Sequence, residues 1–387
     1  MKITAIKTTV VNARLRNWIF VRVETDQPGL TGLGEATLEF QTQAVTGAIA
    51  DLSPLVLGED PRNIEHIWQV LFRHPFFKRG IVTMSALSGI DQALHDIKAK
   101  EFGVPLWQLL GGLVRKKLRM YDHLGGGDSN AVYSDTAANS FAERAARSRE
   151  DGFSAVKILA VPKSAPLDGY TALKEAETLM AAARQGAGDQ MDIMVDLHGR
   201  TTAAMAIQYC KVLEPYRPFF IEEPCQPEDV AGIARVARST PVPIASGERL
   251  THRSEFLPLL ERDAIAVAQP DVCHAGGLTE TRRISALCDT FGVAMAPHNP
   301  LGPIATMVNI HLGFATPNFL IQEVMRSDVP WRNDIVTGGS AIVGGHVLPP
   351  EGKGIGVEID FKAAARHPFE EVKPVQWYHA DGSVADW

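Results

Sequence analysis

Cysteine is scarce in this sequence, and none of it is spaced in a CxxC pair. The chain of 387 residues has four cysteines, and each lies within an apolar run typical of a protein core. This pattern predicts buried thiols in a reducing compartment. The four are Cys210, Cys225, Cys273 and Cys288.

Concentrated positive charge and long apolar runs are also missing. The formal net charge is −7 and the pI is near 6.0, without a stripe of Lys and Arg. Nucleic acid is therefore not expected as the main partner, because phosphate binding needs concentrated positive charge. No stretch approaches the roughly 18 apolar residues of a membrane span. The first residues, MKITAIKTTVV, lack the features of a signal peptide. We expect a cytoplasmic protein that binds a small molecule and no membrane.

The composition, 45% hydrophobic and 21% charged, is that of an ordinary globular protein. Apolar and polar residues alternate over 18–25, as in a strand, and a DQPG turn and a second strand at 30–36 follow. Residues 83–102 have the apolar periodicity of a helix. We predict a small α+β domain over residues 1–117 and a different architecture over 118–365. Residues 366–387 are expected to return and pack on the first domain.

Six polar residues recur at nearly equal steps in the second half of the chain. The steps between them are 26, 26, 23, 27 and 25 residues, and each residue ends an apolar run. A repeat of strand, polar residue and helix at this pitch indicates one shared site. The six are Asp196, Glu222, Glu248, Asp271, His298 and Glu323.

Two earlier strand candidates, 118–124 and 154–160, bring the number of strand and helix units to eight. Eight such units over this length are typical of a (β/α)8 barrel, although a doubly wound open sheet also alternates. The position of the polar residues favours the barrel, because the carboxyl ends of its strands all surround one mouth.

Asp196, Glu222 and Glu248 follow the third, fourth and fifth predicted strands. Three carboxylates that converge in a partly buried mouth repel one another unless a cation neutralises them. Ligation by oxygen alone favours a hard divalent ion, Mg²⁺ before Mn²⁺. The alternative is that each acid caps a helix or pairs with an arginine, which is less favoured for three in register.

His298 follows the seventh strand beside Asp271, so that the carboxylate can bind one imidazole nitrogen and leave the other as a general base. His198 lies two residues after Asp196, and the strand period of two predicts that both face inward. Together with a metal site, these histidines indicate proton abstraction next to a carboxylate.

At this point the residues resemble the enolase superfamily, mandelate racemase subgroup, and most closely the D-galactonate dehydratase branch of the acid-sugar dehydratases. The resemblance runs from end to end, and the combination of motifs is highly specific. The motifs are GIDQALHDIKAK (89–100), LWQLLGG (106–112), DLHGR (196–200), FIEEP (220–224), ASGER (245–249), QPDVCHAGG (269–277), APHNPLGP (296–303) and SVADW (383–387).

The resemblance implies one Mg²⁺ per subunit on the three carboxylates, with Mn²⁺ as a substitute. It implies His298 as the base at C2 of an acid sugar, made more basic by Asp271, and His198 as the acid that expels the C3 hydroxyl. Glu323 would hydrogen-bond the enediolate carboxylate. The product would be a 2-keto-3-deoxy acid.

Racemases of this subgroup carry a Lys-x-Lys pair on the second strand, whereas here Lys157 is followed by Leu159 two residues later. Racemisation is therefore disfavoured, because it needs a base on both faces. A cycloisomerase or epimerase of acid sugars and a non-catalytic binding homologue remain open. We expect a homo-oligomer, and we expect loops 11–17 and 76–79 to cover the mouth.

Overall fold

The N-terminal residues form a three-stranded antiparallel sheet in the computed structural model, which describes residues 1–78, 80–124, 136–161, 163–326, 328–374 and 376–386. Its strands are β1 (Ile3–Asn12), β2 (Asn17–Thr25) and β3 (Thr31–Glu35). The helices that follow are α1 (Thr42–Leu52), α2 (Ile64–Arg73), α3 (Ile81–Phe102) and α4 (Leu106–Leu109).

The sheet packs closely on α3, and two glycines of β3 permit this approach. A Cβ atom on Gly32 would lie 1.9 Å from the carbonyl oxygen of Ala93, and one on Gly34 would lie 2.1 Å from that of Gly89. Only glycine fits at these positions, because any side chain would clash with the helix backbone. The hairpin and the long helix expected from the sequence are both present.

Eight parallel strands form the second architecture, in the order β10-β9-β8-β7-β6-β5-β4-β11. A parallel bridge between Met295 of β10 and Phe319, just before β11, joins the two ends of this order into a ring. The barrel fold expected from the sequence is therefore confirmed. The strands are β4 (Leu118–His123), β5 (Ala155–Ile158), β6 (Asp192–Asp196), β7 (Ile221–Glu222), β8 (Ile244–Ser246), β9 (Val267–Ala268), β10 (Ala294–Met295) and β11 (Gln322–Val324).

The barrel interior is filled by a cluster of buried residues, one from each strand or from the position next to it. A packed interior of this kind is typical of (β/α)8 barrels and leaves the mouth at the strand ends as the place for chemistry. The cluster consists of Tyr121, Ala155, Met194, Phe220, Ala245, Val267, Ala296 and Ile321.

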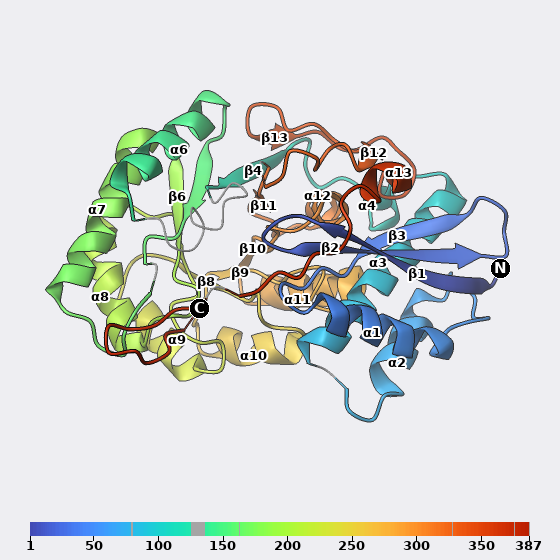
Figure 1. Ribbon diagram of the computed structural model, residues 1–387, viewed down its shortest axis with the longest axis horizontal. Coiled ribbons are helices and arrows are strands. Elements are labelled where there is room, and N and C mark those ends of the chain that lie inside the picture. Colours follow the sequence, from blue (N-terminus) through green and yellow to red (C-terminus); the bar gives the residue numbers. More distant parts are fainter. Residues whose placement is uncertain (79, 125–135, 162, 327, 375, 387) are drawn as a thin grey trace.

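Helices surround this ring, and the sheet and helices of the N-terminal domain lie at one end of the molecule (Figure 1). We call this domain the cap. The helices around the ring are α6 (Ala138–Glu150), α7 (Tyr170–Ala187), α8 (Ala203–Leu213), α9 (Val230–Ala237), α10 (Arg253–Glu261), α11 (Gly277–Thr290) and α12 (Pro303–Ala315).

After the ring, β12 (Val336–Gly338) pairs with β14 (Val357–Ile359), β13 (His346–Val347) pairs with β4, and α13 (Phe361–Ala364) follows.

The last segment of the chain crosses from the cap to the barrel. His367 accepts a hydrogen bond from the backbone of Asn12 at 2.9 Å, which joins the start of the segment to the cap. Further on, Trp377 stacks under the guanidinium group of Arg200 at 4.3 Å. The segment, red in Figure 1, thus extends beyond the cap alone. Trp387, the last residue of the SVADW motif, lies outside the described residues.

Cap side chains hold the loop that follows β9 and the first turn of α11. The indole nitrogen of Trp68 donates to the carbonyl of Gly276 at 2.9 Å, and Asp91 accepts from the backbone and hydroxyl of Thr279. Glu35 of β3 accepts from the backbone N–H groups of Gly302 and Ala305 at the start of α12, both at 2.8 Å. The cap therefore binds directly to the segments that carry the barrel's polar residues.

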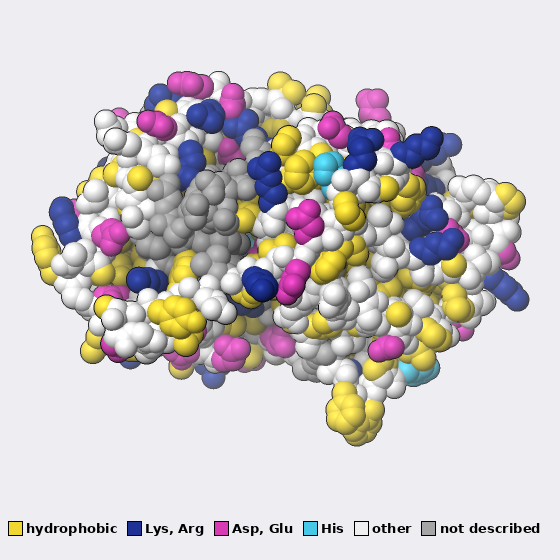
Figure 2. Space-filling model, viewed as in Figure 1, with side chains coloured by type: hydrophobic (Ala, Val, Ile, Leu, Met, Phe, Trp, Pro, Cys, Tyr) yellow, Lys and Arg dark blue, Asp and Glu magenta, His cyan; other side chains and the backbone are white. Residues whose placement is uncertain are grey.

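The surface carries charges of both signs, with Lys, Arg, Asp and Glu side chains interspersed over the face shown in Figure 2. None of the described helices is both long and apolar enough to cross a membrane. All four cysteines are buried and free, as predicted.

Candidate active site

Three carboxylates meet at the carboxyl ends of neighbouring barrel strands. Asp196 ends β6 and Glu222 ends β7, and the two are direct neighbours in the sheet register, while Glu248 lies two residues after β8. One oxygen of each lies within 4.8 Å of the others. Asp196 and Glu222 are completely buried. The spacing expected for a shared cation is therefore present.

A buried lysine from the second barrel strand lies against this group. The Lys157 ammonium is 3.0 Å from Glu222 Oε1, 3.5 Å from Asp196 Oδ2 and 2.8 Å from Glu323 Oε1. One positive charge therefore serves three carboxylates. Glu248 brings a fourth negative group to the same place, so that the cluster keeps an excess of negative charge.

The carboxylate pKa values reflect this imbalance. Burial and the charge of Asp196 raise the pKa of Glu222 to about 7, with Lys157 opposing the shift. Burial also raises the pKa of Glu248 well above its ordinary value, although His298 lowers it. Burial alone would raise the pKa of Asp196, but the charges of His198 and Lys157 hold it below its usual range. A divalent cation would relieve the repulsion that these shifts report.

The donors fit such a cation. Asp196 Oδ2 and Glu248 Oε2 are buried, and within the described parts of the chain they accept no hydrogen bond. Buried carboxylate oxygens without hydrogen bonds are costly unless a further group binds them. Three converging oxygen ligands suit a hard ion and leave coordination positions for water or substrate.

His298 and Asp271 form a hydrogen-bonded pair. His298 Nδ1 donates to Asp271 Oδ2 at 2.7 Å, and the backbone of Cys273 donates to the other oxygen of Asp271 at 2.6 Å. His298 Nε2 lies 3.5 Å from Glu248 Oε2. Burial would lower the pKa of His298, but Glu248 and the bond to Asp271 raise it to about 10. The imidazole of His298 thus directs Nε2 toward Glu248 and the acidic triad.

His198 reaches the site by a different route from the one predicted. The prediction placed it on the same strand as Asp196, but β6 ends at Asp196 and His198 has a φ of 52°. The left-handed turn at His198 and Gly199, not the alternation of a strand, places the imidazole, with Nε2 3.2 Å from Asp196 Oδ2. Arg200 contacts Nδ1 at 3.0 Å.

Glu323 lies within β11, where Oε2 accepts a hydrogen bond from the backbone of Asn299 at 2.7 Å and Oε1 pairs with Lys157. Burial would raise the pKa of Glu323, but Lys157 and His298 lower it to about 2. An ionised carboxylate only accepts hydrogen bonds. The group of this pair that can donate to a negative substrate is therefore Lys157.

A cavity of about 260 Å³ lies over these groups, between the cap and the barrel mouth. The barrel contributes Lys157, His198, Glu248, His298, His123, Arg249 and His274 to its lining.

The cap contributes Arg16, residues 38–41 and Ile81 to the same cavity. Arg16 is paired with Glu39 at 2.7 Å. Loop 11–17 therefore reaches the mouth through Arg16. Phe76 and Phe77 are 88% and 89% exposed and do not line this cavity, and Arg79 lies outside the described residues.

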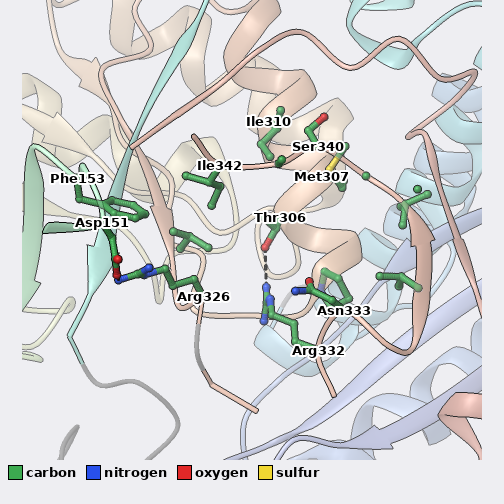
Figure 3. Close-up of a pocket in the computed structure, with 17 residues that line it drawn as sticks. Asp151, Phe153, Thr306, Met307, Ile310, Arg326, Arg332, Asn333, Ser340 and Ile342 are labelled. Atoms are coloured by element: carbon green, nitrogen blue, oxygen red, sulfur yellow. Dashed lines mark hydrogen bonds and ion pairs between the residues drawn. The ribbon is translucent and has the colours of Figure 1, made fainter. Parts of the chain in front are cut away.

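A larger cavity of about 600 Å³ lies elsewhere, beside α12 and the segment that contains β12 (Figure 3). Its arginines are already paired, Arg326 with Asp151 at 2.6 Å and Arg332 with Asp328 at 2.6 Å. The smaller cavity is the one lined by Glu248 of the acidic triad together with His198 and His298.

Three residues of the site lie outside the catalytic and metal sets expected from the sequence: His123, Lys157 and His274. His123 and Lys157 lie at the ends of β4 and β5, so that the series of polar strand ends extends to all eight strands. Extending the series to its first two strands would have identified both. His274 lies in the QPDVCHAGG motif, but its distance from any strand left no positional signal.

Comparison with known proteins gives matches to both halves of the chain. Residues 2–111 match the N-terminal domain of the mandelate racemase and muconate lactonizing enzymes, and residues 140–364 match the enolase C-terminal domain-like family. Relatives named D-galactonate dehydratase, from Ralstonia pickettii and Pectobacterium atrosepticum, are 40% and 38% identical over the whole of both chains.

Solved structures agree with these matches. A member of the enolase superfamily from Salmonella Typhimurium has a TM-score of 0.89 and 32% identity, covering 95% of this chain and 98% of its own. A mandelate racemase/muconate lactonizing enzyme-like protein from Roseovarius sp. TM1035 has a TM-score of 0.89 and 31% identity, covering 96% and 97%.

Proposed function

The chain belongs to the mandelate racemase and muconate lactonizing enzyme family of the enolase superfamily, and we propose that it dehydrates an acid sugar, D-galactonate or a close relative, to a 2-keto-3-deoxy acid. Dehydratase relatives at 37–40% identity over their full length support this reaction. The observation that carries the proposal is the placement of two imidazoles against different carboxylates of one acidic triad.

Asp196, Glu222 and Glu248 would hold one Mg²⁺, which Mn²⁺ can replace. When bound, the ion supplies stabilisation of the negative charge that develops on the substrate carboxylate. The support is the all-oxygen donor set and the two buried carboxylate oxygens described above.

His298 is proposed to take the proton from C2 through Nε2, while Asp271 holds the opposite ring nitrogen and stabilises the imidazolium that forms. His198 is proposed to act in its imidazolium form and to give the proton on Nε2 to the C3 hydroxyl, which leaves as water, so that the ring becomes neutral. The electron pair of the C2–H bond becomes the C2–C3 double bond, and the resulting enol tautomerises to the 2-keto acid.

Glu323 was expected to hydrogen-bond the enediolate carboxylate. Because the Lys157 ammonium lies 2.8 Å from its Oε1, we propose that the two act as a pair in which Lys157 meets the negative charge. Glu323 then holds Lys157 in place. This arrangement also speaks against racemisation, since a lysine surrounded by three carboxylates is poorly placed to act as a second base and Leu159 has no proton to exchange.

The test is a screen of aldonic and aldaric acids with Mg²⁺ present, in which 2-keto acids are measured colorimetrically and products are identified by NMR. We expect a 2-keto-3-deoxy acid from D-galactonate or an isomer, and loss of that activity in EDTA with recovery on adding Mg²⁺. Turnover without any keto acid would indicate a cycloisomerase or epimerase instead. Activity that persists in EDTA would contradict the metal site.

A further inference from the structure

His274 is a buried histidine in the loop after β9, and its neighbour in the cap determines where its proton lies. Its Nε2 is 2.9 Å from the carbonyl oxygen of Thr37. A carbonyl only accepts hydrogen bonds, so Nε2 carries a proton, and in the neutral ring the lone pair is then on Nδ1. The ring is therefore fixed as a donor toward the cap and as an acceptor on its other side.

The acceptor side of the ring has no partner among the described residues. Nδ1 of His274 is buried without a hydrogen bond, and the residue, 6% exposed, lines the cavity over the site. Nδ1 lies 3.7 Å from Asp271 Oδ2, which is itself an acceptor. The ring centre lies 6.5 Å from that of His298. An unpaired acceptor thus stands beside the proposed base.

A buried nitrogen acceptor of this kind is costly unless a ligand supplies a donor. The carboxylate of an acid sugar cannot do so, because it only accepts, whereas a hydroxyl can donate. We propose that His274 Nδ1 accepts a hydrogen bond from a substrate hydroxyl on the chain beyond the reacting C2 and C3 carbons. This inference rests on the proposed function, since it names a polyhydroxy acid as the ligand.

The cap sets the direction of this acceptor. Thr37 follows β3, its hydroxyl donates to Glu35 Oε1 at 2.7 Å, and it accepts from the backbone of Ile19 at 3.0 Å. Both contacts are buried, so the carbonyl that binds His274 has a fixed position. The next residues, 38–41, line the same cavity. The cap therefore orients His274, a barrel residue, toward the substrate hydroxyl, and it also lines the cavity with its own residues.

Two substitutions of similar size separate the roles of the two ring nitrogens. His274→Asn places an amide near Nδ1 that can accept a hydrogen bond, but it cannot reach Thr37. His274→Gln reaches Thr37 with its amide N–H and leaves no acceptor near Nδ1. Both are made in a His298→Asn background with Mg²⁺, where the proposed proton abstraction is blocked, and D-galactonate binding is measured by calorimetry.

We expect His274→Gln to weaken binding about 10-fold, the effect of one lost neutral hydrogen bond, and His274→Asn to weaken it by less than about 3-fold. Equal losses in the two variants, or an unchanged affinity in His274→Gln, would overturn the proposal. Melting temperatures of both variants without sugar report any loss of folding.

The hydroxyl is identified with 4-deoxy, 5-deoxy and 6-deoxy derivatives of D-galactonate. Removing the hydroxyl that binds His274 should weaken binding to the otherwise unsubstituted His298→Asn protein about 10-fold and abolish the difference between Asn and Gln at position 274. A difference that persists with all three derivatives would contradict a contact with any of these hydroxyls and overturn the proposal.

The two proposals fail in different ways. If the screen finds no dehydration but D-galactonate binds and depends on the acceptor at position 274, the dehydratase proposal is wrong and the inference stands. If the protein dehydrates D-galactonate but the Asn and Gln variants lose equal affinity for it, the inference about His274 is wrong and the dehydratase proposal stands. If D-galactonate neither reacts nor binds, both are overturned.

Discussion

Single side chains divide the proposed reaction into two halves that can be measured separately. His298 with Asp271 removes the C2 proton, whereas His198 acts only when the C3 hydroxyl leaves. In D₂O we expect His198→Asn to lose dehydration by at least about 100-fold, the usual contribution of a general acid, yet still exchange the C2 proton for deuterium. His298→Asn should lose both activities.

Proton NMR of the recovered substrate measures the exchange, and the keto acid assay measures dehydration. The two variants are matched controls, because each replaces an imidazole beside the same acidic triad by the same amide. Exchange that disappears in His198→Asn while metal binding is retained would show that His198 also takes part in proton abstraction, contrary to the proposed division.

Lys157 is the second side chain whose removal should have a distinct effect. Without it, three buried carboxylates lose their shared cation, and breaking a buried ion pair costs about 3–5 kcal/mol. We expect Lys157→Met to lower the melting temperature strongly in EDTA and to gain more stability from Mg²⁺ than the unsubstituted protein does.

The exposed Lys174, which pairs with Glu177 on the surface, is the control, and Lys174→Met should leave the melting temperature unchanged. Differential scanning calorimetry with and without Mg²⁺ decides the matter. A Lys157→Met protein as stable in EDTA as the parent would show that the carboxylates do not need this charge.

The sequence was sufficient to predict the acidic triad and the Asp271 and His298 pair, because each follows an apolar strand and the strand ends converge. It also placed His198 and Glu323 in the site, but it did not predict the left-handed turn that positions His198 or the ion pair between Lys157 and Glu323. A one-dimensional pattern records spacing, whereas an ion pair between β5 and β11 depends on the pairing of β11 with β4, the first strand of the ring.

Among the helices, α12 shows how one titratable side chain can join three segments. His311 of α12 accepts at Nδ1 from the backbone of Trp107 in α4 and donates from Nε2 to the carbonyl of Ile355 before β14, both at 3.1 Å. Burial lowers its pKa from 6.5 to about 4. A second ring proton would remove the acceptor for Trp107.

Below pH 6.5 the unfolded chain binds a proton at His311 that the folded protein does not, so falling pH favours unfolding until about pH 4. His311→Gln should be less stable than the parent at pH 7. Between pH 7 and pH 5, however, the free energy of unfolding of the parent should fall by about 2 kcal/mol more than that of the variant.

Urea unfolding at both pH values measures this difference. His66→Gln, at a histidine whose side chain is 60% exposed, is the control and should follow the parent. Parallel pH profiles for His311→Gln and the parent would show that His311 is protonated equally in the folded and unfolded states.

The eight strands of the ring were all predicted from apolar runs, but the runs are longer than the strands. The run at 264–271 gives only Val267–Ala268 as β9, and the run at 218–224 gives only Ile221–Glu222 as β7. The residues beyond each strand are apolar because the mouth and the interior bury them, not because they pair in the sheet. The sequence therefore indicates which residues are buried, but not how many of them pair with a neighbouring strand.

At the level of the whole molecule, the cap and the barrel share their stabilising contacts. Glu35 belongs to a cap strand, yet it accepts the N–H groups that begin α12 of the barrel, and the Thr37 that binds His274 donates to it. Trp68 holds the loop after β9 and Asp91 holds the first turn of α11 in the same way. Groups shared between two bodies favour cooperative unfolding as one unit.

Glu35→Gln tests this coupling with almost no change of shape. Its amide nitrogen must face a donor, either the N–H of Gly302 or that of Ala305, so that one buried N–H loses its acceptor at a cost of about 2 kcal/mol. Because the contact joins both bodies, we expect the loss to appear as one transition shifted to lower temperature. Far-UV circular dichroism follows the helices, near-UV circular dichroism follows buried aromatic side chains of both bodies, and the two melting curves should coincide. Separate transitions, with only one of them moved by the substitution, would show that the cap folds independently of the barrel whose site it covers.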